Sequence, residues 1–152
     1  MPDGNEAQGV EGTEKEDQVV KSEQRITEFV CRTSFADIPA AAVKVTKNQV
    51  LAILGTTIAG ASAEGCETAV DIARELGGKP DASILIHGSK VPAHQAAFVN
   101  AVMARALDFC DATIPGAHPG AAIVPAALAA AEMVGGVNGA DFLAAVSVGT
   151  EL

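Results

Sequence analysis

The sequence has almost no aromatic residues: among its 152 residues there are five Phe and no Trp or Tyr. Platforms that stack nucleic-acid bases and cages that hold quaternary ammonium groups depend on such rings, so neither kind of site is expected. Basic residues are also few, ten against 19 acidic ones, and the formal net charge is −9. A field of that sign repels phosphate backbones and argues against a nucleic-acid-binding protein, although a local site can still hold a small anion.

Cysteines and long apolar runs are scarce as well. The three cysteines, Cys31, Cys66 and Cys110, form no CxxC pair and no disulfide framework, which is typical of a reducing compartment. The longest apolar run, Ala121 to Ala131, has 11 residues, whereas a membrane-spanning helix needs about 20. We therefore expect a cytoplasmic protein with no membrane span.

Acidic residues are concentrated at the N-terminus. Residues 1–24 contain seven acidic residues and two lysines, with almost no apolar side chain before Val19. Such a stretch buries too little surface to offset the entropy lost on ordering, so we predict a disordered acidic tail over residues 1–24. It does not fit a targeting signal, because secretory signals place basic residues before an apolar run and transit peptides contain few acids.

From residue 25 onward, apolar residues recur with a helical period. Prolines and glycines stand where helices would begin and end. The pattern predicts helices over residues 25–33, 40–59, 64–76, 93–109 and 121–134, and a last helix that starts at Asn138 or Gly139. One short extended segment is predicted near residues 83–86. The sequence therefore predicts an all-α bundle of about six helices.

The same pattern predicts which helix faces are buried. The expected core positions of the second and third helices are Val43, Val50, Leu51, Leu54, Ile58, Val70, Ile72, Ala73 and Leu76. Residues 121–134 are nearly all apolar, as in a helix that is buried on every side.

One polar, irregular segment, residues 108–120, lies between two of these apolar helices. Asp108 and Asp111 are three residues apart and share a face if the helix reaches residue 111. His118 directly precedes a helix N-terminus, where negative charge is favoured. An imidazole beside a carboxylate is a workable general acid or base. Ordinary capping and turn residues give the same pattern, so spacing alone leaves both interpretations open.

No recognised metal-ligand spacing is present among Asp108, Cys110, Asp111 and His118, and no metal site is predicted. Two further histidines, His87 and His94, flank Lys90 and are expected to be solvated loop residues.

Two stretches closely resemble the MmgE/PrpD family: AAFVNAVMARALDFCD over residues 96–111 and HPGAAIVPAALAAAE over residues 118–132. Further matches are FADIP at 35–39 and AAVSVGTEL at 144–152, so the resemblance covers about residues 25–152. The family includes 2-methylcitrate dehydratase, cis-aconitate decarboxylase and an iminodisuccinate epimerase. The resemblance implies a lyase or isomerase that acts on small di- or tricarboxylic acids by proton transfer next to a carboxylate, with no metal and no organic cofactor.

The resemblance also implies roles for individual residues. The family's active-site aspartate and histidine match Asp108 and His118, and Thr113 is the nearest candidate for its neighbouring threonine. Asp108 would orient or bind the substrate, and His118 would transfer a proton or donate a hydrogen bond to a carboxylate. Thr113 and Lys90 are the substrate-binding candidates, since carboxylate recognition normally uses Arg or Lys partners. These residues do not separate a dehydratase from a decarboxylase or an epimerase.

Family members are about three times as long as this chain and are usually homodimers, with a helical domain and a smaller α/β lid. Residues 25–152 are therefore expected to be an incomplete helical domain, the N-terminal fragment of such a lyase, and to be inactive alone. A second hypothesis is a non-catalytic helical module, or a truncated paralogue, that pairs with another subunit through its alanine-rich faces.

Overall fold

The computed structural model describes residues 21–114 and 116–152, and the chain divides into two compact units near Thr33. In the first unit, residues 21–32 form a helix whose exposed apolar stripe is Ile26, Phe29 and Val30. Residues 21–24, which the sequence assigned to the acidic tail, belong to this helix because Lys, Glu and Gln are good helix formers. The rest of that predicted tail lies outside the described residues.

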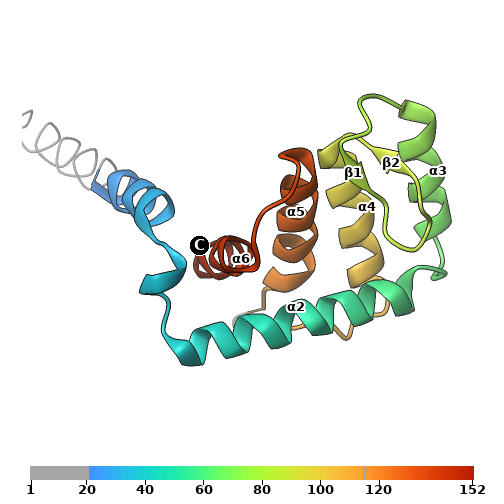
Figure 1. Ribbon diagram of the computed structural model, residues 1–152. Helices are drawn as coiled ribbons and strands as arrows, with labels where there is room; N and C mark the ends of the chain where they lie inside the picture. The colour runs from blue at the N-terminus through green and yellow to red at the C-terminus, as the bar shows by residue number, and fades with distance from the viewer. Residues whose placement is uncertain (1–20, 115) are drawn as a thin grey trace, which may run out of the picture. The chain divides into compact units, whose positions relative to one another are not determined.

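The second unit, Ser34–Glu151, is a helical bundle. Its elements in chain order are η1 (Phe35–Asp37), α2 (Ala40–Gly60), α3 (Cys66–Leu76), β1 (Ala82–Ser83), β2 (Lys90–Val91), α4 (Ala93–Arg105), α5 (Pro119–Met133) and α6 (Gly139–Glu151). The helices α4 and α5 lie side by side and run in opposite directions, and α2 crosses beneath them (Figure 1). The predicted all-α class is therefore confirmed. No helix among residues 21–114 and 116–152 has the length and hydropathy needed to cross a membrane.

The extended segment expected near residues 83–86 is part of a small hairpin. β1 pairs with β2 in an antiparallel manner, with Ala82 opposite Val91 and Ser83 opposite Lys90. Beyond Ser83 the Ile84 amide still donates across the hairpin to the Ser89 carbonyl, and the side chain of Asn100 of α4 donates to the Ser83 carbonyl and accepts from the Leu85 amide. The sequence predicted neither β2 nor this buried asparagine.

Two clusters of buried side chains form the core. One lies between α3, α4 and the hairpin and includes Val70, Ile84 and Met103, and the other joins α2, α5 and α6 through Ile53, Val124 and Val146. Alanine supplies eight of the buried hydrophobic residues in the described chain. At Gly60, α2 approaches α4 so closely that a Cβ atom would lie 2.1 Å from the carbonyl oxygen of Met103. These small residues allow the helix backbones to pack tightly.

The predicted buried faces were partly wrong. Leu51 and Ile58 are 72% and 61% exposed, and Ile72 and Leu76 are also exposed. α2 instead buries Thr46, Thr56 and Thr57 beside Ile53. Their hydroxyls are satisfied within the protein, since Thr56 and Thr57 donate to the Ile53 carbonyl and Thr46 bonds the Ser147 hydroxyl. Because the threonine face of α2 points into the core, the opposite face, which carries Leu51 and Ile58, is exposed.

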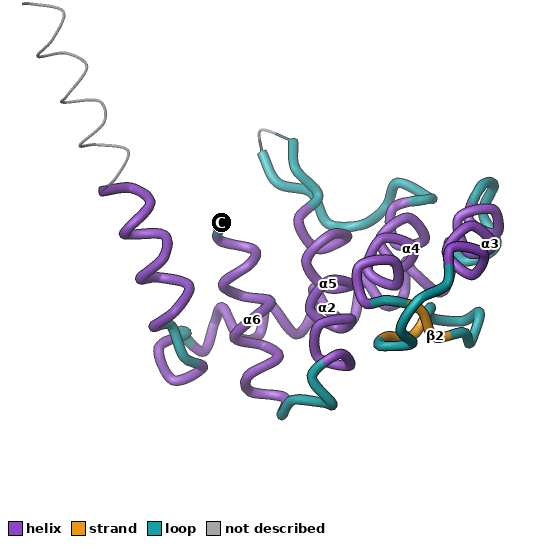
Figure 2. The backbone as a smooth tube through the Cα atoms, turned by 90° about the horizontal axis from the view of Figure 1, so that it is seen from above, coloured by secondary structure: helices purple, strands orange, loops and turns teal. Residues whose placement is uncertain are grey.

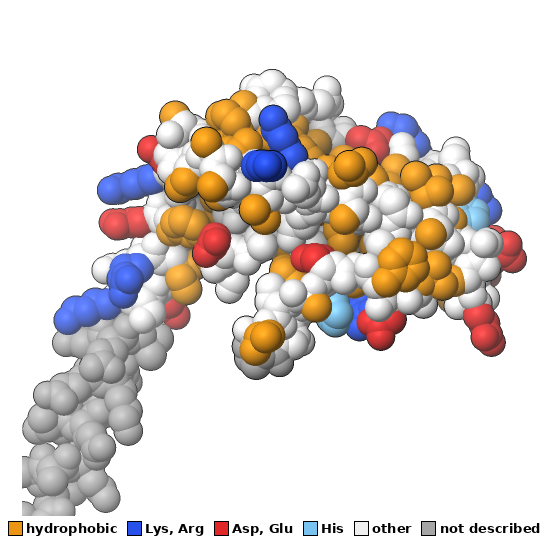
Figure 3. Space-filling view, turned by 90° about the horizontal axis from the view of Figure 1, so that it is seen from below, with side chains coloured by type: hydrophobic (Ala, Val, Ile, Leu, Met, Phe, Trp, Pro, Cys, Tyr) orange, Lys and Arg blue, Asp and Glu red, His pale blue; other side chains and the backbone are white. Residues whose placement is uncertain are grey.

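Exposed apolar residues also occur on the other helices. α5 was expected to be buried on every side, but Ala122, Ala126 and Ala130 are exposed along one row of this helix. Figure 3 views the molecule from below, the side on which α2 lies in Figure 1, and shows hydrophobic side chains spread over much of this face. The expected helix over 93–109 ends at Arg105, so Leu107 and Phe109 lie outside it and are exposed.

Glu132, near the end of α5, ties this helix to the hairpin. Its carboxylate accepts hydrogen bonds from the Ser83 amide at 3.2 Å, the Ser83 hydroxyl at 2.8 Å and the Lys90 ammonium at 3.1 Å. Burial acts to raise the pKa of Glu132, but the hydrogen bonds and the positive charge together outweigh it. The pKa of Glu132 therefore lies below its ordinary value, and the carboxylate is ionised at neutral pH.

Replacing Glu132 with glutamine is expected to lower the free energy of unfolding by about 1–3 kcal/mol at neutral pH, as for the loss of charge-assisted hydrogen bonds. Because the folded-state pKa is lowered, this stability is present above the unfolded-state pKa of Glu and is lost as the pH falls through the folded-state value. Urea unfolding at neutral and strongly acidic pH measures both effects. The exposed Glu75 of α3, changed to glutamine, is the matched control. An equal loss at both pH values would contradict the prediction.

Candidate active site

The polar segment identified from the sequence is the loop between α4 and α5, which projects from the ends of these helices (Figure 2). α4 ends at Arg105, and Asp108 adopts a left-handed backbone conformation with φ of +56°. Aspartate tolerates this conformation better than most residues. Asp108 and Asp111 therefore do not share a helix face, and the interpretation that depended on a longer helix was wrong.

His118 is the residue at which the loop passes into α5. It occupies the N-cap position, and Pro119 is the first residue of the helix, where its missing N–H is not needed. The ring atom Nδ1 of His118 lies 2.8 Å from the carbonyl oxygen of Asp111. A carbonyl can only accept, so Nδ1 carries a proton, and in the neutral ring Nε2 keeps its lone pair. The half-buried imidazole thus offers one nitrogen for proton transfer.

The carboxylate of Asp111 is part of the same arrangement. Its Oδ2 accepts a hydrogen bond from the Gly120 amide at 3.0 Å and from the Gln49 side chain at 2.9 Å. The Oε1 atom of Gln49 lies 3.3 Å from the Thr150 hydroxyl, whose single proton also has the Val146 carbonyl as a partner at 2.8 Å. This chain of contacts joins α2, the loop, α5 and α6. Sequence reasoning missed Gln49, because it is 62 positions from Asp111 and no local spacing connects the two residues.

Asp108 lies on the outside of the loop, with its side chain 74% exposed. It forms an ion pair with Arg105, the last residue of α4. The hydrogen bond from Arg105 and the charge of its guanidinium hold the pKa of Asp108 below its usual range, and the charge of His118 adds a smaller effect in the same direction. No hydrogen bond joins Asp108 to His118 among the described residues, so the Asp111 carbonyl, rather than the Asp108 carboxylate, orients the ring.

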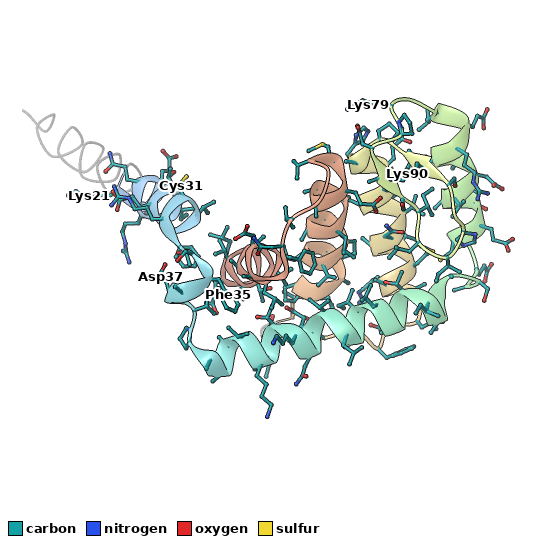
Figure 4. The ribbon with its side chains drawn as sticks, viewed as in Figure 1. Lys21, Cys31, Phe35, Asp37, Lys79 and Lys90 are labelled. Carbon is teal, nitrogen blue, oxygen red and sulfur yellow. The ribbon has the colours of Figure 1, made fainter. Side chains whose placement is uncertain are left out.

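Thr113 and Lys90, the two substrate-binding candidates, lie in different places. Thr113 forms an isolated β-bridge with Ala117 in the same loop, and its hydroxyl lies 3.5 Å from the Ala117 carbonyl oxygen. Lys90 lies on the hairpin beside Glu132, at the far end of α5 from His118 (Figure 4). The structure therefore brings Asp108, Thr113 and His118 into one loop but places Lys90 away from them.

A hollow of about 570 Å³ lies at the Lys90 end of the bundle. Leu128, Val137 and Phe142 are among its apolar lining residues, and Lys90 and Glu132 also line it. Neither Asp108 nor His118 borders this hollow. Within the described residues, no group of three or more His, Cys, Asp or Glu side chains is arranged to hold a metal ion.

Comparison with known protein families gives a match over residues 24–152 to the model described as the MmgE/PrpD N-terminal domain. A search of curated proteins gives no match. The matched range includes all the helices of the second unit and the whole α4–α5 loop.

Proposed function

The chain belongs to the MmgE/PrpD family, and from this premise we propose that its α4–α5 loop supplies proton-transfer groups for a lyase acting on small di- or tricarboxylic acids. A dehydratase of the 2-methylcitrate type is the favoured activity, with a decarboxylase or an epimerase as alternatives within the family. The observation that carries the proposal is the hydrogen bond from His118 Nδ1 to the Asp111 carbonyl, because it leaves Nε2 as a base at a helix N-terminus.

In the proposed reaction, Nε2 of His118 removes a proton from the carbon next to a substrate carboxylate. For a dehydration, the C–H electron pair forms the C=C bond while the C–O bond at the neighbouring carbon breaks, and the hydroxyl leaves as water after taking up a proton. The positive end of the α5 dipole favours a carboxylate beside His118. The ionised Asp108 can accept a hydrogen bond from a substrate hydroxyl, and Arg105 beside it is a cation at the same end of the bundle.

Deuterium exchange tests this proposal without assuming which bond finally breaks. Because residues 25–152 alone are expected to be inactive, the protein assayed carries them together with the remaining helical domain and lid of the family. It is incubated in D2O with citrate, 2-methylcitrate or a chiral dicarboxylate, and proton NMR follows the carbon next to each carboxylate. We expect deuterium to enter at that carbon in at least one compound, because a dehydratase and an epimerase remove this proton, and a decarboxylase adds a proton from solvent to the same carbon after CO2 has left. The absence of both exchange and turnover across the whole panel would contradict the proposal.

The exposed alanine row of α5, residues 122, 126 and 130, favours a second candidate, a helical module that pairs with another subunit or with a second copy of the chain. Small side chains let another helix approach closely, and exposed apolar patches commonly mark contact surfaces. A protein that shows no exchange in D2O but sediments as a stable dimer would favour this candidate over the lyase.

A further inference from the structure

We propose that Asp111 is a positioning residue. Its carboxylate accepts hydrogen bonds from Gln49 and the Gly120 amide, and these bonds hold the Asp111 backbone carbonyl where it selects the tautomer of His118. The catalytic consequence of this assignment depends on the proposed function. The structural consequence, which nitrogen of His118 carries the proton, is independent of any substrate.

Two neighbours of Nδ1 in His118 favour opposite tautomers. The carbonyl oxygen of Asp111, at 2.8 Å, requires a proton on Nδ1. The Sγ atom of Cys110 lies 3.6 Å from the same nitrogen, and a thiol can donate a weak hydrogen bond to an unprotonated Nδ1. If the carbonyl moved away, the thiol would become the nearest partner, and the proton would shift to Nε2. The position of the Asp111 carbonyl therefore decides whether Nε2 is a base.

The loop itself gives this carbonyl little support. Its described residues, 106–114 and 116–118, contain no helix and only the single bridge between Thr113 and Ala117. The supports come instead from neighbouring helices, through Gln49 of α2 at 2.9 Å and the Gly120 amide of α5 at 3.0 Å. Both hydrogen bonds are partly buried and end on the same carboxylate oxygen, so they hold the residue from two sides.

The fit around Asp111 leaves little freedom for the carboxylate to move. Its other oxygen, Oδ1, is buried and has no hydrogen-bond partner within the described residues. A Cβ atom at position 120 would lie 2.4 Å from this oxygen, so glycine is required for the close approach. Burying an unsatisfied carboxylate oxygen costs free energy, which the two bonds to Oδ2 and the α5 dipole offset. A costly arrangement of this kind is expected where a precise position matters.

The test reads the tautomer of His118 directly by ¹⁵N NMR of the labelled full chain, because Nδ1 and Nε2 have different chemical shifts in the two tautomers. Gln49→Met keeps the length of the side chain but removes its donor. We expect the ratio of the Nε2–H to the Nδ1–H form to rise about threefold or more, as for the loss of one ordinary hydrogen bond. Thr150→Val removes a hydroxyl that Gln49 shares with the Val146 carbonyl and should cause a smaller shift in the same direction.

Control variants separate positioning from general stability. Asn48→Met changes the neighbouring, exposed residue of α2 and should leave the tautomer ratio unchanged. Asp111→Asn keeps an acceptor for the Gly120 amide and should retain more of the Nδ1–H form than Asp111→Ala. A folded Gln49→Met protein with the wild-type tautomer ratio would overturn the proposal, as would equal ratios in Asp111→Asn and Asp111→Ala if Gln49→Met does not fold.

The outcome for the proposed function remains separate. A shifted tautomer in Gln49→Met, combined with no deuterium exchange on any carboxylic acid by the wild-type protein, would support the positioning role while removing the lyase. Exchange by the wild-type protein with no tautomer shift in any variant would support the lyase and reject the positioning role of Asp111.

Discussion

Replacing His118 with glutamine is expected to slow proton exchange on a carboxylic acid substrate by about 10²- to 10⁴-fold, the range that general acid–base groups contribute. The amide of glutamine can still donate to the Asp111 carbonyl, so the entry into α5 should be preserved. An amide has no nitrogen lone pair of useful basicity at neutral pH, so the proton-accepting function of Nε2 is lost.

Initial rates of deuterium exchange at saturating and limiting substrate measure this effect, together with far-UV circular dichroism to check the fold. His94→Gln is the matched control, because His94 is an exposed histidine in the first turn of α4, at the other end of that helix from the loop. We expect that control to retain wild-type rates. If His118→Gln kept its rate within about threefold of the wild type, His118 would have no part in the proton transfer.

Replacing Gly60 with alanine is expected to lower the free energy of unfolding by about 2–4 kcal/mol, a cost typical of overpacking where nothing can relax. The added Cβ atom would lie 2.1 Å from the carbonyl oxygen of Met103 and 3.1 Å from its carbonyl carbon. Both are backbone atoms of α4, so no side-chain rotation removes the clash. The two helices must separate, which loosens both core clusters.

Gly55 on the same helix provides the control for this change. A Cβ atom there meets nothing within 4 Å. Gly55→Ala should therefore stabilise the protein by about 0.5–1 kcal/mol, since alanine loses less backbone entropy than glycine in a helix. Because the chain lacks Trp and Tyr, urea unfolding is best followed by circular dichroism. Equal stabilities of the two variants would show that α2 and α4 are not in close contact at Gly60.

The sequence predicted the helices well because their boundaries depend on local chemistry. Gly60 ends α2, and Pro92 and Pro119 stand at the starts of α4 and α5, where proline's fixed φ is tolerated. The buried faces were harder to predict because burial depends on which neighbours a helix meets. On α2, threonines whose hydroxyls bond the Ile53 carbonyl can be buried at little cost, and hydropathy alone assigns the inward face to Leu51 and Ile58 instead.

The candidate site was predictable only where it is local in sequence. His118 and Asp108 stand out because polar residues are concentrated between two apolar helices, and the structure places them in one loop. The role of Gln49 depends on α2 passing next to that loop, a tertiary relation with no sequence signature. The position of Lys90 depends on the hairpin, whose second strand was not predicted. Its ammonium group forms an ion pair with Glu132 rather than lying near His118.

The alanine-rich packing of α4 against α5 also affects how the stability depends on temperature. Alanine has no side-chain rotamers to lose on folding, so the core forms with a small entropic penalty while burying little apolar area per residue. The heat capacity of unfolding scales with the apolar area that becomes exposed, and here it should lie at or below the usual ~12–15 cal/mol/K per residue. A small heat capacity flattens the curve of stability against temperature, so the protein should resist cold denaturation and lose stability gradually on warming.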